Sequence, residues 1–156
     1  MFRHVYLSLG SNLGDRAAYL REAVARIALL PETTVVAQST HHETAPWGNT
    51  EQPSFLNMAL SIDTALSPED LLDAIHTIEH ALGRQRQQQW GPRTLDIDLL
   101  VDEAYTRDTP ELHLPHPLMT ARLFVLDPLA EIAPDLVVRG KTVREWRDAL
   151  GNGATA

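Results

Sequence analysis

The sequence predicts an α+β fold, a ferredoxin-like α/β sandwich in which helices pack on a mainly antiparallel sheet with long loops beside it. Three observations support this prediction. The expected elements follow the order β-α-β-β-α-β, the strands alternate apolar and polar side chains, and the two helices carry apolar stripes at helical spacing. In such a sandwich two helices cover one face of the sheet. We expect loops to cover the other face and the functional site to lie there.

The first strand, the first helix and the second strand lie within the first forty residues. Residues 5–9 form a strand with alternating apolar side chains, and the turn at 10–15 has the composition of a helix N-cap. The helix runs to about Leu30, where a proline ends it, and the β-branched stretch 33–40 forms the next strand. The buried stripe of the helix consists of Leu20, Ala23, Val24, Ile27 and Leu30.

The second half of the sandwich follows a long irregular loop at residues 42–54. Residues 55–64 form a strand. Ser67-Pro68 then begins a helix, because serine caps a helix well and proline fits its first position. Gly83 is suited to end that helix. A basic loop leads into a strand at 94–101.

The C-terminal third is less regular. An apolar segment at 122–129 follows a stretch rich in histidine and proline, and a final helix is expected at 142–150. We expect residues 1–150 to form a single domain and residues 151–156 to form a flexible C-terminal tail.

Composition limits the class of protein. The chain has 156 residues, of which 44% are hydrophobic, as in a soluble globular domain. It has no cysteine, which excludes disulfides, thiolate metal sites and a cysteine nucleophile. Its net charge of −8 argues against general nucleic-acid binding, which relies on lysine and arginine. The sequence contains no signal peptide and no membrane-spanning run. We therefore expect a monomeric cytoplasmic protein.

Two carboxylates stand on the strand at 94–101. Side chains alternate along a strand, so Asp96 and Asp98 share one face, about 7 Å apart at Cα. Their repulsion is roughly 0.6 kcal/mol in water and about 2.4 kcal/mol at an effective dielectric constant of 20. A divalent cation between them would relieve it. Oxygen ligands favour Mg²⁺ or Mn²⁺ over zinc. The alternative interpretation is a strand face exposed to solvent.

Three arginines precede the carboxylates. Arg84, Arg86 and Arg93 lie within ten residues that contain no acid, and a basic loop on an acidic protein is typical of a small-anion site. A polyphosphate is the natural partner of these arginines and a metal ion. The alternative is a solvated loop.

Other polar and aromatic residues have two interpretations each. His113 and His116 have zinc-like spacing, but no third ligand is apparent. Asn57 interrupts an apolar strand, and a buried amide must be hydrogen-bonded, either to loop backbone or to a ligand. Trp47 and Trp90 lie in loops, where aromatic residues belong either to a small core or to a ligand pocket.

Five short motifs occur in a fixed order along the chain. They are L-G-S-N at 9–12, F-L-N at 55–57, G-R-x-R at 83–86, W-G-P-R-T-L-D-I-D at 90–98 and L-P-H-P at 114–117. Together they resemble the 6-hydroxymethyl-7,8-dihydropterin pyrophosphokinase family of folate biosynthesis. The resemblance runs from about Val5 to Leu136.

The resemblance implies that the β,γ-pyrophosphoryl group of ATP moves to the pterin hydroxymethyl oxygen, with release of AMP. Two Mg²⁺ ions are expected on Asp96 and Asp98, where they neutralise and align the triphosphate. Arg84 and Arg93 join these carboxylates as the implied catalytic residues. Asp96 is also the nearest candidate for a general base. The implied ATP-binding residues are Glu79, Arg84, Arg86, Trp90, Arg93, Leu99, His116 and Arg122.

The resemblance also implies a pterin site. An asparagine amide reads the edge of the ring, an aromatic pair stacks on its faces, and a loop supplies backbone contacts. These residues are Thr44, Ala45, Trp47, Phe55, Asn57 and Phe124. We expect the loops at 42–54 and 84–90 to close over ATP and exclude water.

The chain departs from the family pattern at three places. The stretch 87–89 is one residue shorter than in the best-known members and reads Gln-Gln-Gln, so the anion clamp is expected to be weaker or to depend on Arg84 and Arg93. Pro117 stands where some members have tyrosine, which removes one possible phosphate contact. Glu111 stands where some members have arginine, so the resemblance does not define the contacts to adenine.

Three other functions are alternatives to this one. A nucleotide-sensing module would need phosphate ligands but not the paired acids. An RNA-binding ferredoxin-like domain would need exposed aromatics on its central strands, which the stretch 94–101 lacks. Partnership or fusion with neighbouring folate enzymes is not visible in one chain.

Overall fold

The core of the molecule is an antiparallel sheet. The computed structural model describes residues 1–44, 54–83 and 95–154. Four long strands lie in the order β2-β4-β1-β5, and the short β3 pairs with β4. The strands are β1 (Arg3–Ser11), β2 (Thr33–Gln38), β3 (His42–Thr44), β4 (Phe55–Thr64) and β5 (Asp96–Asp102). This order and the antiparallel pairing confirm the predicted α+β sandwich.

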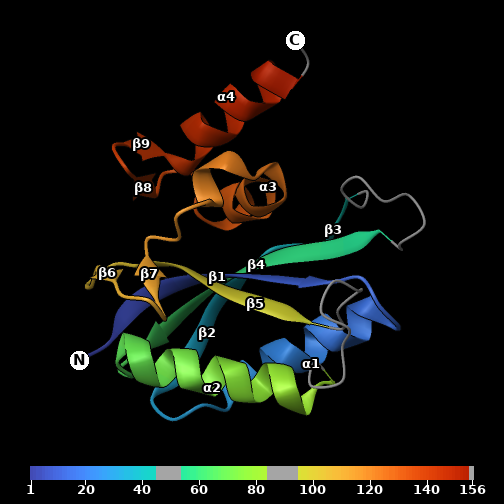
Figure 1. The fold of residues 1–156 in the computed structure, drawn as a ribbon, viewed down its shortest axis with the longest axis vertical. Helices are drawn as coiled ribbons and strands as arrows, with labels where there is room; N and C mark the ends of the chain where they lie inside the picture. Colours follow the sequence, from blue (N-terminus) through green and yellow to red (C-terminus); the bar gives the residue numbers. More distant parts are fainter. Residues whose placement is uncertain (45–53, 84–94, 155–156) are drawn as a thin grey trace.

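Two helices cover one face of the sheet, below it in Figure 1. They are α1 (Arg16–Ala28) and α2 (Pro68–Ala81). Asp15 caps α1 by accepting the Ala18 amide at 3.1 Å, and Ser67 caps α2 by accepting the Asp70 amide at 3.1 Å. Their apolar stripes meet alternate residues of the sheet in one cluster. Its fully buried members include Leu7, Leu9, Leu20, Ile27, Leu60, Ile62, Leu71, Ile75 and Leu95.

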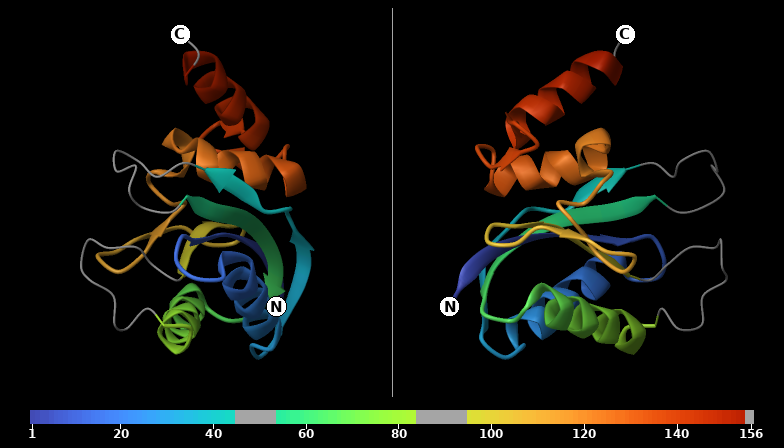
Figure 2. Two further views of the ribbon diagram at one scale, coloured as in Figure 1. Left: turned by 90° about the vertical axis from the view of Figure 1, so that its right-hand side faces the viewer. Right: turned by 60° about the vertical axis from the view of Figure 1, so that its left-hand side comes forward.

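The expectation that loops cover the other face is wrong. Two helices, α3 (Leu123–Ile132) and α4 (Val143–Ala154), lie on that side, with α3 between the sheet and α4 (Figure 2). The strands carry apolar side chains on this face too, and these need cover from water. A second cluster results, formed by Ala59, Leu100, Met119, Val125, Leu126, Leu129, Ala130, Val138 and Val143. The turn η2 (Met119–Ala121) leads into α3.

Two small hairpins complete the described chain. One pairs β6 (Arg107–Asp108) with β7 (His113–Leu114), and the other pairs β8 (Val137–Val138) with β9 (Lys141–Thr142). The described helices include none that is long and apolar enough to cross a membrane.

Several boundaries differ from the predicted ones for physical reasons. β1 extends to 3–11 because β4 pairs with it along that whole length. Residues 42–44, predicted as loop, form a strand because β4 supplies the partner backbone. α4 runs to Ala154 and does not end at 150, since glycine keeps the backbone amide of a helix although it costs about 1 kcal/mol.

Candidate active site

A cavity of about 860 Å³ lies between one end of the sheet and the segment that enters α3. Strands β1, β3, β4 and β5 supply its floor and wall, and η2 and α3 supply its opposite side. The described residues that line it are Ser8, Gly10, Thr44, Phe55, Asn57, Asp96, Asp98, Leu118, Ala121, Arg122, Leu123, Phe124 and Leu150. Seven of the residues assigned from the sequence meet in this one space.

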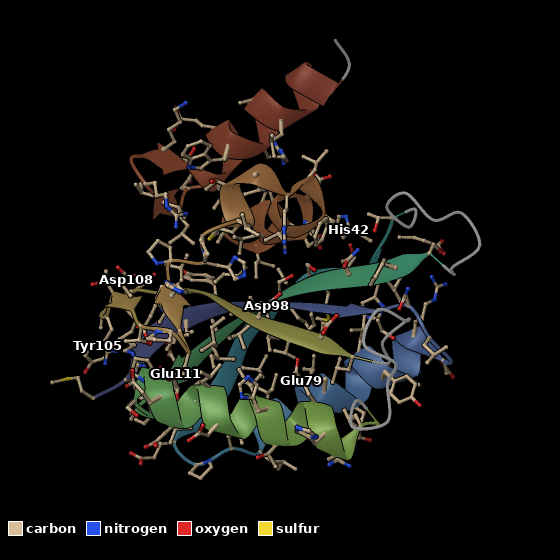
Figure 3. All side chains as sticks on the ribbon, viewed as in Figure 1. His42, Glu79, Asp98, Tyr105, Asp108 and Glu111 are labelled. Carbon is tan, nitrogen blue, oxygen red and sulfur yellow. The ribbon has the colours of Figure 1, made fainter. Side chains whose placement is uncertain are left out.

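The two carboxylates of β5 face the cavity. Asp96 pairs with Gly10 and Asp98 with Ser8 on the central strand. Ile97, between them, is buried in the core that the sheet forms with α1 and α2, which confirms the alternation expected from the sequence. Figure 3 shows Asp98 on the side of β5 that faces α3. Two carboxylate side chains on alternate residues of one strand suit a hard divalent cation.

Asn57 lies on the other side of the central strand. Gly10 pairs with Asn57 of β4 as well as with Asp96 of β5. The Asn57 side chain is only 4% exposed, and its Nδ2 donates to Thr44 Oγ1 at 2.9 Å. Its partner is therefore a side chain of β3 and not loop backbone. A Cβ added at Gly10 would lie 3.0 Å from Asn57 Oδ1, so glycine leaves the room that this amide occupies.

Two aromatic rings line the same cavity. Phe55 begins β4 beside Thr44, and Phe124 lies in the first turn of α3. The Arg122 guanidinium lies 5.6 Å from the centre of the Phe124 ring. A flat heterocycle fits a site with aromatic walls and a fixed amide at its edge.

His116 lies beside a second, smaller cavity of about 230 Å³. Asp98 lines both cavities, and Leu99 and His116 line the smaller one with Leu72, His76, Ile97, Glu111, Leu112, His113 and Pro117. The Leu118 amide donates to His116 Nδ1 at 3.1 Å. Burial lowers the pKa of His116 below its usual value, against the opposing effect of Asp98. A neutral ring with Nδ1 as acceptor carries its proton on Nε2.

Comparison with known proteins identifies the family. Residues 6–134 match the sequence profile of the 7,8-dihydro-6-hydroxymethylpterin-pyrophosphokinase family. The chain is 54% identical over 140 residues to the 2-amino-4-hydroxy-6-hydroxymethyldihydropteridine pyrophosphokinase of Methylorubrum extorquens, which covers 90% of this chain and 89% of that one. The protein of the same name from Bacillus subtilis is 44% identical over 153 residues, 94% of this chain and 92% of that one. The chain belongs to this pyrophosphokinase family.

Solved structures agree with the fold. The Plasmodium falciparum HPPK-DHPS with pteroate superposes on 96% of this chain with a TM-score of 0.76 and 15% sequence identity. This chain spans 42% of the length of that larger protein. At this identity the likeness supports the α+β fold and nothing finer.

Glu79 is not among the described residues that line the two cavities of the pyrophosphokinase. The family resemblance had implied that it binds ATP. It is 3% exposed at the end of α2, and its Oε2 accepts the Ile97 amide at 2.8 Å. Sequence reasoning missed this bond. The available signal was an acid in the buried stripe of a helix, four residues after Ile75.

Arg16, Glu43 and Ser54 form a polar cluster that joins the described residues on either side of the segment 45–53, and sequence reasoning missed it as well. Arg16 Nη1 donates to Glu43 Oε2 at 2.9 Å and to the Ser54 carbonyl at 2.8 Å. Ser54 Oγ also donates to Glu43 Oε2 at 2.6 Å. The Ser54 and Arg16 hydrogen bonds hold the pKa of Glu43 below its usual value.

Six assigned residues lie outside the part of the chain that the structure describes. They are Ala45, Trp47, Arg84, Arg86, Trp90 and Arg93. The expected closure of the loops over ATP falls largely on the same segments. Within 1–44, 54–83 and 95–154 there is no group of three or more histidine or acidic residues that could hold a metal ion. Asp96 and Asp98 both line the larger cavity, and two carboxylates alone would leave most positions around an Mg²⁺ ion to phosphate oxygens and water.

Proposed function

We propose that this protein transfers the pyrophosphoryl group of ATP to 6-hydroxymethyl-7,8-dihydropterin in the 860 Å³ cavity. The products are AMP and the dihydropterin pyrophosphate, a step of tetrahydrofolate biosynthesis. The family of the chain and the names of its relatives support this reaction. A single domain at residues 1–150 carries it, and the family match to residues 6–134 supports that extent.

One observation carries the assignment of the reaction to this cavity. Asp96 and Asn57 flank the same residue, Gly10, on adjacent strands. Neighbouring strands lie about 4.8 Å apart, so the metal-type and amide-type ends of the site are roughly 10 Å apart at Cα. That separation suits an acceptor held at Asn57 whose hydroxyl points toward a triphosphate at the carboxylates. Transfer of this kind depends mainly on such positioning.

On the nucleotide side, Asp96 and Asp98 hold two Mg²⁺ ions together with ATP. Bound Mg²⁺ supplies charge neutralisation to the triphosphate. Asp98 borders both cavities, which supports a triphosphate between them and a nucleoside in the smaller one, beside Leu99. His116 donates from Nε2, and Arg122 adds positive charge at the rim of the larger cavity. Arg84, Arg86 and Arg93 clamp the phosphates, and Trp90 contacts the nucleotide.

On the pterin side, Asn57 reads the polar edge of the ring. Thr44 accepts one Nδ2 hydrogen, which fixes the amide plane and leaves the second hydrogen for the ligand. Phe55 and Phe124 stack on the ring from β4 and α3. Ala45 and Trp47 complete this side through loop contacts. We propose that the enzyme acts as a monomer, since both cavities are lined by residues of one chain. We also propose that it acts in the cytoplasm.

An AMP-release assay with Mg-ATP tests the reaction. We expect AMP only when hydroxymethyl-dihydropterin is present. Asp98→Ala is expected to lower kcat at least 100-fold while pterin binding is retained, because the change removes charge stabilisation of the phosphates and leaves Asn57 in place. Absent or pterin-independent AMP release by the wild-type protein would overturn the assignment. A nucleotide-sensing module would bind ATP without turnover and would tolerate Asp98→Ala.

A further inference from the structure

A buried carboxylate reaches the strand that carries the proposed metal ligands. Glu79 lies in the last turn of α2, on the side of β5 opposite Asp98 (Figure 3), and it is 3% exposed. Burial of an ionised carboxylate is costly unless hydrogen bonds compensate for the lost water. Its Oε2 accepts the backbone amide of Ile97 at 2.8 Å. This hydrogen bond lies in a region that is shielded from solvent.

The acceptor is needed because β5 is the last strand in the order of the main sheet. Strand β1 pairs with one edge of β5. At the other edge, the Ile97 amide bonds to Glu79 and the Leu100 carbonyl accepts the His116 amide at 2.8 Å. Two groups from outside the sheet therefore hold the outer edge of β5.

Ile97 stands between the two carboxylates. Its side chain packs into the core that the sheet forms with α1 and α2, while Asp96 and Asp98 face the cavity. A shift of the main chain at Ile97 moves both carboxylates, since each is one peptide away. A pair of metal ligands tolerates little displacement.

We infer that Glu79 is a positioning residue, whose bond to the Ile97 amide sets the place of Asp96 and Asp98 for the metal–triphosphate complex. This inference rests on the proposed function of the carboxylate pair. It differs from the ATP contact implied by the family resemblance, because Glu79 acts through the β5 backbone. Outer partners that orient metal ligands contribute about 10-fold to 100-fold to metal affinity or activity.

Three substitutions separate the hydrogen bond from charge and from packing. Glu79→Gln keeps the length and an amide oxygen that accepts the Ile97 amide. Glu79→Asp keeps the charge but is one methylene too short to reach. Glu79→Leu removes the acceptor and keeps an apolar volume. Glu69→Gln is the matched control, because Glu69 lies on the same helix and pairs with Arg107 at 2.7 Å, away from β5.

The probe is Mn²⁺, titrated by electron paramagnetic resonance in the presence of a non-hydrolysable ATP analogue. We expect the Mn²⁺ dissociation constant to rise 10-fold or more in the Asp and Leu variants, with kcat lower by a similar factor. The Gln variant and the Glu69 control should stay within about fivefold of wild type. Pterin affinity, measured by fluorescence, should remain unchanged in all four.

Two results would overturn the inference. One is a Gln variant as impaired as the Leu variant, which would assign the effect to charge. The other is unchanged Mn²⁺ affinity in folded Asp and Leu variants, which would make the bond merely structural. A Leu variant that fails to fold leaves the Gln and Asp pair to decide. Failure of the proposed function is separate, since it would appear as absent AMP release by the wild-type protein.

Discussion

Gly10 shows how one missing side chain shapes a binding site. It lies on the central strand between the residues that pair with it, Asn57 and Asp96. The Asn57 amide oxygen occupies the space that a Cβ at Gly10 would approach to 3.0 Å, tighter than ordinary van der Waals contact. Glycine here provides room for a neighbouring side chain and not an unusual backbone angle.

We predict that Gly10→Ala weakens pterin binding about 10-fold while the protein stays folded. The added methyl displaces the Asn57 amide by a few tenths of an ångström, which costs about 1.4 kcal/mol of a directional hydrogen bond to the ligand. Fluorescence titration with a pterin analogue measures the change. Gly151→Ala is the control, because nothing lies within 4 Å of a Cβ there. Equal pterin affinity in Gly10→Ala and wild type would contradict the assigned role of Asn57.

At the scale of elements, β3 is held from two sides. Arg16 of α1 bonds to Glu43 and Ser54, on either side of the segment 45–53. From the opposite layer, Glu131 of α3 accepts the Thr40 amide at 2.7 Å and bonds to His42 Nε2 at 2.9 Å. These contacts fix a three-residue strand that carries Thr44 into the cavity.

We predict that Glu131→Gln destabilises the protein at neutral pH by about 1 kcal/mol or less, because the contact of Glu131 with His42 is partly exposed to water. The hydrogen bonds from His42 and then Thr40 lower the pKa of Glu131 from 4.5. A carboxyl group with a lowered folded-state pKa stabilises the fold above its unfolded value and loses that contribution as pH falls through the folded value. The wild-type advantage should therefore be full above pH 4.5 and shrink in acid.

Urea unfolding across this pH range measures that prediction. Glu22→Gln serves as the control, since Glu22 makes an exposed pair with Arg26 one helical turn away. A stability difference for Glu131→Gln that stays constant into acid would show that the charge of this carboxylate does not act.

At the scale of the whole molecule, the sheet has an apolar core on each face. One core lies between the sheet and helices α1 and α2, and the second lies between the sheet and α3 with part of α4. Leu60 and its neighbour Ala59 belong to different cores, which couples the two layers through one strand. The cavity lies where α3 meets the end of this sheet, so its opposite wall depends on the second core.

We predict that Leu126→Ala lowers the free energy of unfolding by 2–5 kcal/mol, the usual cost of emptying a buried leucine site. Leu126 is a fully buried residue of α3 in the second core. Urea unfolding should show one transition, because the two cores share the sheet. Leu29→Ala, at a residue 84% exposed, should change stability by less than about 0.5 kcal/mol. Two separate transitions in the Leu126 variant would mean that α3 folds independently of the sheet.

Local patterns predicted much of the fold and part of the site. The strand at 55–64, the Ser67 cap and the shared face of Asp96 and Asp98 all follow from residues a few positions apart. The motifs identified the family, and the family indicates the pyrophosphoryl transfer, because the residues of these motifs are expected to act together in one site. The role of each site residue is a prediction, and the assays described above test several of these roles.

The sequence by itself determined the element order β-α-β-β-α-β, the strand with Asp96 and Asp98 on one face, and the family of the enzyme. Tertiary structure alone decided which partners meet across the chain. Glu79 bonds to an amide 18 residues away, β3 exists because β4 pairs with it, and α3 covers a face that loops were expected to cover. The physical reason is that side-chain period and caps are local, whereas a buried hydrogen bond or an apolar face is satisfied by whatever the folded chain brings to it. The proposed metal ligands could be predicted from the sequence, but the role of Glu79, which we infer to position them, could not.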